Sequence, residues 1–309
     1  QIWGIESVDG LEFEDQSETS TCRRKERNKL SDSTELYEPL MERLTSIGQQ
    51  HLLQFWNQLG DEERRGLHRQ ISDLDFELIG SLFSGSAAKK DFSGLAELAS
   101  PPPAVTADGS GASWTPDQAR QRGEEALRAG EVGAVIVAGG QGTRLGFDHP
   151  KGMFPIGPVS KRTLFQFFAD RMIATRRRYG ARVPLYLMTS EATDQETRQY
   201  FESNDYLGLD PDDVYIFQQG TMPAVDARTG QLLMSAPDSL ALSPDGHGGT
   251  VSALKRSGCL DDAAERGVRH LAYIQVDNPL ADLCDPTLIG HHLMAESEMT
   301  TQVVRKRDP

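Results

Sequence analysis

The chain has 309 residues, of which 38% are hydrophobic and 25% charged, a composition typical of a globular protein with one large or two modest domains. It contains no apolar run near the roughly 20 residues of a membrane-spanning helix, and its formal net charge of -14 argues against nonspecific nucleic-acid binding. The three cysteines are odd in number and widely spaced, which indicates neither a disulfide framework nor a zinc site. We therefore expect a cytoplasmic protein that binds neither membranes nor nucleic acids.

The first third of the chain predicts helices followed by a linker. Apolar residues recur at helical spacing up to Phe83, and we assign residues 1–83 to a helical N-terminal element. Residues 84–114 are rich in Ser, Gly and Ala and contain a triple proline, which is typical of extended surface chain. The remaining residues, 115–309, form the third predicted part.

Strand-like and helix-like segments alternate in this third part, which predicts a doubly wound, mostly parallel α/β sheet of the Rossmann-like type. The expected strands are 132–138, 183–188, 214–217 and 270–276, and the expected helices are 117–129, 163–179 and 191–203. Ligands of such sheets gather at the carboxyl ends of the strands. Gly139, Gln219 and Asp277 all lie at the ends of expected strands, so we predict a ligand site along that edge.

A glycine-rich stretch with two nearby cations is the most informative feature. The sequence GGQGTRLG, Gly139–Gly146, follows a buried strand, and glycines there let backbone N–H groups approach an anion. Arg144 and Lys151 add a guanidinium, which binds two oxygens, and an ammonium, which acts as a point charge. The stretch predicts a polyphosphate site, with a turn that serves only packing as the alternative.

The spacing of this stretch excludes two common nucleotide motifs. Gly140 and Gly142 are followed by a third glycine only at Gly146, one residue late for a dinucleotide fingerprint. Lys151 follows a proline and precedes Gly152, unlike the lysine of a P-loop. We therefore expect neither an NAD site nor a P-loop ATPase.

Five motifs in one order resemble a known family. They are GGQGTRLG at 139–146, PKG at 150–152, FQQG at 217–220, PDGHGG at 244–249 and VDN at 276–278. Together they resemble the eukaryotic-type UDP-sugar pyrophosphorylases, and within these the UDP-N-acetylhexosamine pyrophosphorylases most closely. The resemblance implies a GT-A-like, nucleotide-diphospho-sugar transferase fold and transfer of UMP from UTP to a hexose 1-phosphate. Family members continue past the end of this chain, so we expect a fragment that lacks the C-terminal part of the catalytic domain.

The resemblance also implies roles for individual residues. Arg144 would hold the β- and γ-phosphates of UTP, Lys151 would contact the α-phosphate, and Asp277 would bind a Mg²⁺ ion that bridges the phosphates. The residues expected around uracil are the backbone of Val137, Ala138, Gly139, Gly140 and Gly246 and the side chain of Gln219. Taken alone, Asp277 and Gln219 have simpler interpretations, a turn-capping aspartate and a polar loop residue.

His247 leaves the sugar open. The N-acetylhexosamine enzymes carry asparagine at this position, whereas UDP-glucose and broad-specificity enzymes have the GHG pattern seen here. We expect His247 to donate to a sugar hydroxyl or phosphate, with a solvent-facing loop histidine as the alternative. N-acetylglucosamine 1-phosphate is the favoured substrate and glucose 1-phosphate the alternative. Two other classes are a non-catalytic uridine-nucleotide-binding module and an interaction protein built on the N-terminal helices. The sequence does not indicate an oligomeric state.

Overall fold

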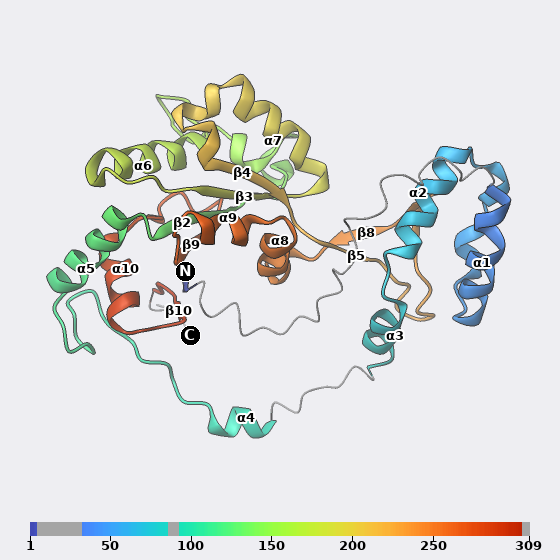
Figure 1. The fold of residues 1–309 in the computed structure, drawn as a ribbon, viewed down its shortest axis with the longest axis horizontal. Coiled ribbons are helices and arrows are strands. Elements are labelled where there is room, and N and C mark those ends of the chain that lie inside the picture. Colours follow the sequence, from blue (N-terminus) through green and yellow to red (C-terminus); the bar gives the residue numbers. More distant parts are fainter. Residues whose placement is uncertain (5–32, 86–92, 305–309) are drawn as a thin grey trace. The chain divides into compact units, whose positions relative to one another are not determined.

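In a computed structural model of the chain, the described residues are 1–4, 33–85 and 93–304, and they form two compact units. The α/β unit consists of described residues 1–4, 103–220 and 245–304 (Figure 1). The helical unit consists of described residues 33–85, 93–102 and 221–244. Residues 221–244, which we expected to belong with 115–309, therefore lie in the unit formed by the N-terminal helices.

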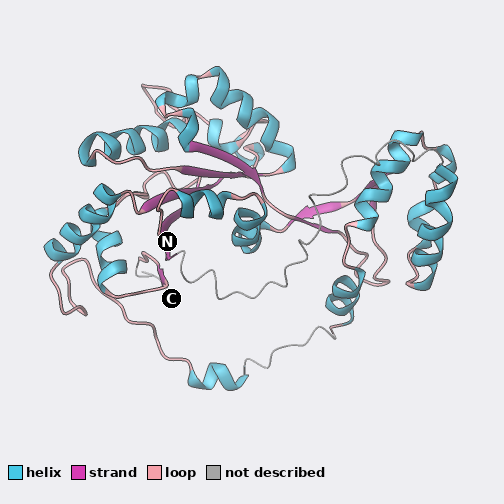
Figure 2. Ribbon diagram, in the orientation of Figure 1, coloured by secondary structure: helices cyan, strands magenta, loops and turns pink. Residues whose placement is uncertain are grey.

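Six strands within the described residues form the sheet of the α/β unit, in the order β10-β1-β9-β2-β3-β4. Their bounds are β1 (Ile2–Gly4), β2 (Val132–Val137), β3 (Leu185–Thr189), β4 (Val214–Gln218), β9 (His270–Gln275) and β10 (Met299–Thr300). Strands β9, β2, β3 and β4 run parallel, and β1 is antiparallel to both β9 and β10. Figure 2 shows the strands in magenta and the helices around them in cyan. The arrangement confirms the predicted mostly parallel α/β sheet.

Helices cover both faces of this sheet, as a doubly wound arrangement requires. On one face lie α5 (Pro116–Ala129), α6 (Leu164–Tyr179), α7 (Glu191–Ser203) and α10 (Pro286–Met294), and on the other lie α8 (Thr250–Arg256) and α9 (Cys259–Glu265). Side chains of β2 alternate between them, with Ile136 in the first apolar cluster and Val135 in the second. Every residue of β2 is buried because a central parallel strand is covered on both faces.

Local sequence explains where the longer helices begin and end. The hydroxyl of Thr115 accepts a hydrogen bond from the backbone N–H of Gln118, and Thr163 caps α6 in the same way. Gly130 and Gly180 follow the two helices in the left-handed conformation, which glycine adopts without a steric cost. The expected strands and helices of this unit agree with the structure to within two residues at each end.

The helical unit contains α1 (Ser33–Ser46), α2 (Asp61–Ser72), α3 (Phe76–Ser84) and α4 (Ser93–Leu98), with short 3₁₀ helices η2 (Gln50–Leu53) and η3 (Trp56–Gln58). Its strands pair as two antiparallel ribbons, β5 (Thr221–Pro223) with β8 (Leu242–Pro244) and β6 (Met234–Ala236) with β7 (Ser239–Leu240). Leu232 and Leu240 are buried in one core with Trp56, Leu67 and Ile71. These leucines are the physical reason that the inserted segment belongs to this unit, since the helices supply their apolar cover.

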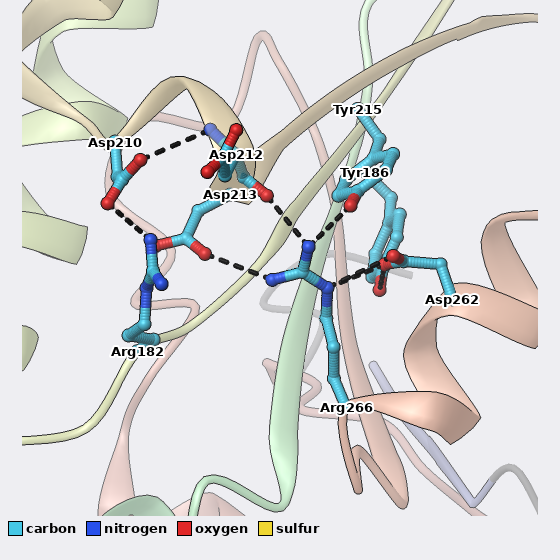
Figure 3. Close-up of polar contacts among 8 residues, drawn as sticks. All are labelled: Arg182, Tyr186, Asp210, Asp212, Asp213, Tyr215, Asp262 and Arg266. Carbon is cyan, nitrogen blue, oxygen red and sulfur yellow. Dashed lines mark hydrogen bonds and ion pairs between the residues drawn. The ribbon is translucent and has the colours of Figure 1, made fainter.

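A charged network joins the amino ends of β3 and β4 to the end of α9 (Figure 3). The guanidinium of Arg266 donates to the carboxylates of Asp262 and Asp213. It also donates to the hydroxyl of Tyr215 and to the backbone carbonyl of Asp212. This network lies at the edge of the sheet opposite the predicted ligand site, so the two features occupy different ends of the same strands.

Candidate functional site

The glycine-rich loop begins after β2 at Gly139, and the chain returns to the start of the loop at Lys151. The backbone N–H of Ala138 donates to the carbonyl of Met188 at 2.7 Å, which fixes the start of the loop against β3. The N–H of Gly142 donates to the carbonyl of His149 at 2.9 Å, and that of Lys151 donates to the carbonyl of Gly140 at 3.0 Å. The loop is therefore closed by its own backbone, and Lys151 lies beside Gly140.

Lys151 and Asp277 meet at this edge of the sheet. Lys151 begins the 3₁₀ helix η5 (Lys151–Met153), and Asp277 lies in the turn after β9. The ammonium Nζ lies 3.1 Å from the carboxylate Oδ2 of Asp277, and the two side chains are 26% and 49% exposed. The structure thus brings together a cation and a carboxylate that are 126 residues apart and leaves both accessible to a ligand.

Arg144 lies in the 3₁₀ helix η4 (Thr143–Leu145) and is exposed. Its side chain has no hydrogen bond or ion pair with any other residue that the structure describes. The structure therefore does not bring Arg144 into the Lys151–Asp277 pair, and its guanidinium has all of its donors available.

Gly139, Ser190 and Gln219, which follow β2, β3 and β4, lie close together at the ends of these strands. A methyl group placed on Gly139 would lie 3.1 Å from the amide Nε2 of Gln219 and 3.3 Å from the backbone nitrogen of Ser190. The hydroxyl of Ser190 donates to the carbonyl of Gly139 at 2.7 Å. Val137 and Ala138, the two residues before Gly139, are 8% and 1% exposed. Gln219 is thus held against the first glycine of the loop, where a larger residue would displace it.

Gly246 and His247 return to the same end of the sheet after the inserted segment. The backbone N–H of Asp245 donates to the carbonyl of Gly220 at 3.0 Å, which places the turn of Gly246 next to the segment that carries Gln219. Gly246 has a φ of 64° in the 3₁₀ helix η8 (Gly246–Gly249), and its α-carbon faces open space. The ring nitrogen Nδ1 of His247 lies 2.6 Å from the hydroxyl of Tyr273.

A family model described as UTP–glucose-1-phosphate uridylyltransferase, named UDPGP, matches residues 115–309. The chain belongs to the UDPGP family. The match spans the glycine-rich loop, Lys151, Gln219, the turn of Gly246 and Asp277, so all of the predicted site residues lie within the UDPGP match.

Relatives with curated names extend the similarity to the helical unit. UDP-N-acetylglucosamine diphosphorylase 1 of Arabidopsis thaliana is 36% identical over 280 residues, which cover 87% of this chain and 55% of that protein. UDP-N-acetylglucosamine pyrophosphorylase of Saccharomyces cerevisiae is 41% identical over 189 residues, 60% of this chain and 40% of that protein. The chain spans about half the length of the curated relatives it matches. The UDPGP assignment confirms the resemblance predicted from the five motifs.

A solved structure shares this fold. The uridine diphosphate N-acetylglucosamine pyrophosphorylase of Trypanosoma brucei, in complex with an inhibitor, matches with a TM-score of 0.63 and 28% sequence identity. The match covers 83% of this chain and 54% of that chain. None of the helices in the described part of our UDPGP chain is both long and apolar enough to cross a membrane.

Sequence reasoning missed a buried network behind Gln219. Asp194 accepts hydrogen bonds from the hydroxyl of Thr189 at 2.6 Å and from Nε of Arg198 at 2.8 Å. Burial raises the pKa of the Asp194 carboxyl, but the hydrogen bonds from Arg198, Thr189 and Gln218 outweigh burial and hold the pKa below its usual value. Through Gln218, the last residue of β4, the network holds the end of this strand in place. A Thr-Ser pair that ends a strand was the available signal for this network and for Ser190.

The residues at this edge suit a magnesium ion that arrives with a nucleotide. Among the described residues there is no group of three or more His, Cys, Asp or Glu side chains that would hold a metal alone. Magnesium needs one or two carboxylates when phosphate oxygens and water complete its coordination. The half-exposed carboxylate of Asp277 beside the glycine-rich loop meets that requirement.

Two cavities lie away from this edge. One, of about 550 Å³, lies in the helical unit between His51, Phe55 and the inserted segment. The other, of about 390 Å³, lies in the α/β unit and is lined by Met172 and Arg176 of α6 and by Leu209. Neither includes Arg144, Lys151 or Asp277. We place the site at the edge rather than in a cavity because anion capture by backbone amides and cations needs no enclosed apolar space.

Proposed function

We propose that this chain binds UTP and catalyses uridylyl transfer to a hexose 1-phosphate, giving a UDP-sugar and pyrophosphate. The observation that carries the proposal is the Lys151–Asp277 pair, 3.1 Å apart beside Gly140. It supplies a cation and a metal-binding carboxylate at the loop that the UDPGP match includes. A cytoplasmic location belongs to the same proposal and rests on composition alone.

The reaction needs charge neutralisation more than a protein nucleophile. A phosphate oxygen of the sugar 1-phosphate attacks the α-phosphorus of UTP, a new P–O bond forms, and the bond to the β-phosphate breaks to release pyrophosphate. Both reactants are anions, so the barrier falls when positive groups hold them in line. In our proposal Lys151 contacts the α-phosphate and Arg144 holds the departing pyrophosphate. Mg²⁺ held by Asp277 would neutralise phosphate charge.

Uridine selection is proposed to come from the turn at the end of β4. The side-chain amide of Gln219 offers both a donor and an acceptor, which matches the alternating pattern of uracil. The backbone from Val137 to Gly140 and the open turn at Gly246 would line the other edges of the base. We therefore expect this edge to bind UTP in preference to ATP.

The sugar is proposed to be N-acetylglucosamine 1-phosphate. The Arabidopsis and yeast relatives are named for UDP-N-acetylglucosamine, whereas the UDPGP family model is described by glucose 1-phosphate. His247 in the GHG pattern keeps glucose 1-phosphate and a broader range of sugars as the alternative.

Calorimetry on the 309-residue chain and a pyrophosphate-release assay on the complete gene product test the proposal together. We expect UTP with Mg²⁺ to bind at least tenfold more tightly than ATP, a difference of about 1.4 kcal/mol. Pyrophosphate release should depend on a sugar 1-phosphate, with those of N-acetylglucosamine, N-acetylgalactosamine, glucose and galactose compared in parallel. Binding of UTP without release of pyrophosphate by the complete gene product would favour the non-catalytic module, and no binding would refute both functions.

Lys151→Ala is the sharpest variant for this proposal. Loss of the ammonium should lower turnover at least a hundredfold, because removing one preorganised charge contact costs about 2.7 kcal/mol or more in the transition state. Lys161→Ala, which removes an exposed cation from another loop, is the matched control and should keep the parent rate. Equal rates for the Lys151 variant and the parent chain would remove Lys151 from the reaction.

A further inference from the structure

The contact between His247 and Tyr273 joins the predicted sugar residue to the central sheet. Nδ1 of His247 and the hydroxyl oxygen of Tyr273 are 2.6 Å apart, a short hydrogen bond. The imidazole stands edge-on to the phenol ring, with ring centroids 6.4 Å apart at an interplanar angle of 79°. His247 is exposed, and its other nitrogen, Nε2, has no partner among the described residues.

Tyr273 is the fixed member of this pair. It lies in β9, is 9% exposed, and belongs to the apolar cluster under α8 and α9. Trp3 of β1 stacks on its ring with centroids 4.6 Å apart. Burial raises the pKa of the Tyr273 hydroxyl, so this group keeps its proton at neutral pH. The ring of His247 is therefore oriented by the sheet and not the reverse.

The proton in the hydrogen bond between Tyr273 and His247 determines which tautomer of His247 a ligand would contact. A neutral imidazole has one N–H donor and one acceptor nitrogen. A phenol is a good donor, and when Tyr273 donates to Nδ1 the ring proton of His247 must lie on Nε2. Nε2–H is then a donor on the exposed side of the ring, where a hydroxyl or phosphate oxygen can accept from it.

We infer that Tyr273 is a positioning residue that holds His247 in the Nε2–H form and aims this donor at the sugar 1-phosphate. The inference rests on the proposed function and adds a specificity device to it. Asparagine at the position of His247 would offer an amide N–H without any choice of tautomer. Tyr273 therefore matters only while residue 247 is histidine, and that dependence separates positioning from a general role in packing.

Nitrogen NMR of the unliganded chain tests the pairing without reference to activity. The chain has seven histidines, and His247→Asn identifies the signals of His247 by their loss. We expect an unprotonated Nδ1 and a protonated Nε2 for His247 at neutral pH. Tyr273→Phe should shift this toward a mixture of tautomers, and Tyr200→Phe, which removes a hydroxyl bonded to Thr163, should leave it unchanged. A protonated Nδ1, or the same tautomer ratio in Tyr273→Phe, overturns the inference.

Calorimetry with UDP-N-acetylglucosamine and UDP-glucose tests the consequence for the ligand. Tyr273→Phe should weaken binding of the preferred UDP-sugar about fivefold, the effect of one neutral hydrogen bond, and leave the affinity for UTP unchanged. In the His247→Asn background the same change should have no further effect. Additive losses in the double variant, or equal losses for UTP and the UDP-sugar, overturn the inference. A parent chain that binds neither ligand refutes the proposed function, and the tautomer signals then decide the pairing alone.

Discussion

Gly139 shows how one missing side chain shapes the base edge. A methyl group on Gly139 would lie 3.1 Å from the amide nitrogen of Gln219 and 3.3 Å from the backbone nitrogen of Ser190, so one of the two must give way slightly. The backbone nitrogen cannot move without shifting β3, so the flexible amide would yield first. Gly139 therefore couples the start of the loop to the side chain proposed to select uracil.

Gly139→Ala should weaken UTP binding about tenfold, because a displaced Gln219 amide loses roughly one well-formed hydrogen bond to the base. Gly66→Ala in α2 is the matched control, since a methyl group there meets no atom within 4 Å. Calorimetric titration of both variants with UTP measures the effect. Parent-like affinity in Gly139→Ala would contradict this coupling between Gly139 and Gln219.

His292 makes the stability of the α/β unit depend on pH. This side chain of α10 is 1% exposed, and its Nδ1 lies 3.0 Å from the hydroxyl of Thr300. Burial, and then the neighbouring ring of His270, lower the pKa of His292 from 6.5 to about 4. An unfolded histidine binds its proton at higher pH than this buried one. The neutral His292 side chain therefore contributes fully to the free energy of unfolding above pH 6.5, and this contribution is lost as pH falls toward 4.

The free energy of unfolding should therefore fall by up to about 3 kcal/mol between pH 6.5 and pH 4 because of His292 alone. Urea unfolding across this range measures the slope, and His292→Gln should flatten it. His68→Gln, at a partly exposed histidine of α2, should keep the slope of the parent chain. A slope that is the same in all three proteins would contradict the assignment.

Between elements, the network around Arg266 holds the amino ends of β3 and β4 to α9. Arg266→Ala leaves the carboxylates of Asp262 and Asp213 and the hydroxyl of Tyr215 without that donor. We expect a loss of about 2 kcal/mol in the free energy of unfolding, since such partners are partly buried and cannot all find water. Arg120→Ala breaks an exposed ion pair with Asp117 and should cost less than about 0.5 kcal/mol. Chemical denaturation compares the two.

The elements that could be predicted from the sequence are those whose pattern of apolar and capping residues indicates both the type of element and its burial. The continuous apolar run of β2 indicates a strand covered on both faces, and caps such as Thr163 mark where helices begin. The edge rule for parallel sheets then places Lys151 near Asp277. Strands β1 and β10 were missed because three and two residues are too short to show a period.

Three further features had no local signal. Leu232 and Leu240 indicate burial but not which apolar core covers them, and in the structure that core is the one of the N-terminal helices. The pairing of His247 with Tyr273 joins a loop to a strand 26 residues away and depends on the direction of one tyrosine side chain. Arg144 was grouped with Lys151 from sequence proximity, although the described contacts leave it unpaired.

The division into two units predicts separate responses to core mutations. Leu232 is 1% exposed in the core of the helical unit, and Leu232→Ala should cost this unit about 3 kcal/mol. Hydrogen exchange should accelerate in α1 and α2 while the exchange of β2 and β3 stays at the parent level. Affinity for UTP should change less than twofold. Faster exchange throughout both units would show that they unfold as one.

The inserted segment has a consequence for any cleavage of the backbone. The chain enters the helical unit before Pro103, leaves it, and then contributes Leu232 and Leu240 from beyond Gly220. A protease that nicks the polypeptide near Pro103 would leave the amino-terminal fragment without two leucines of its own core. Those leucines stay covalently attached to the larger fragment, so the pieces would remain associated until a denaturant separates them. Fragments expressed apart would for the same reason need each other to assemble.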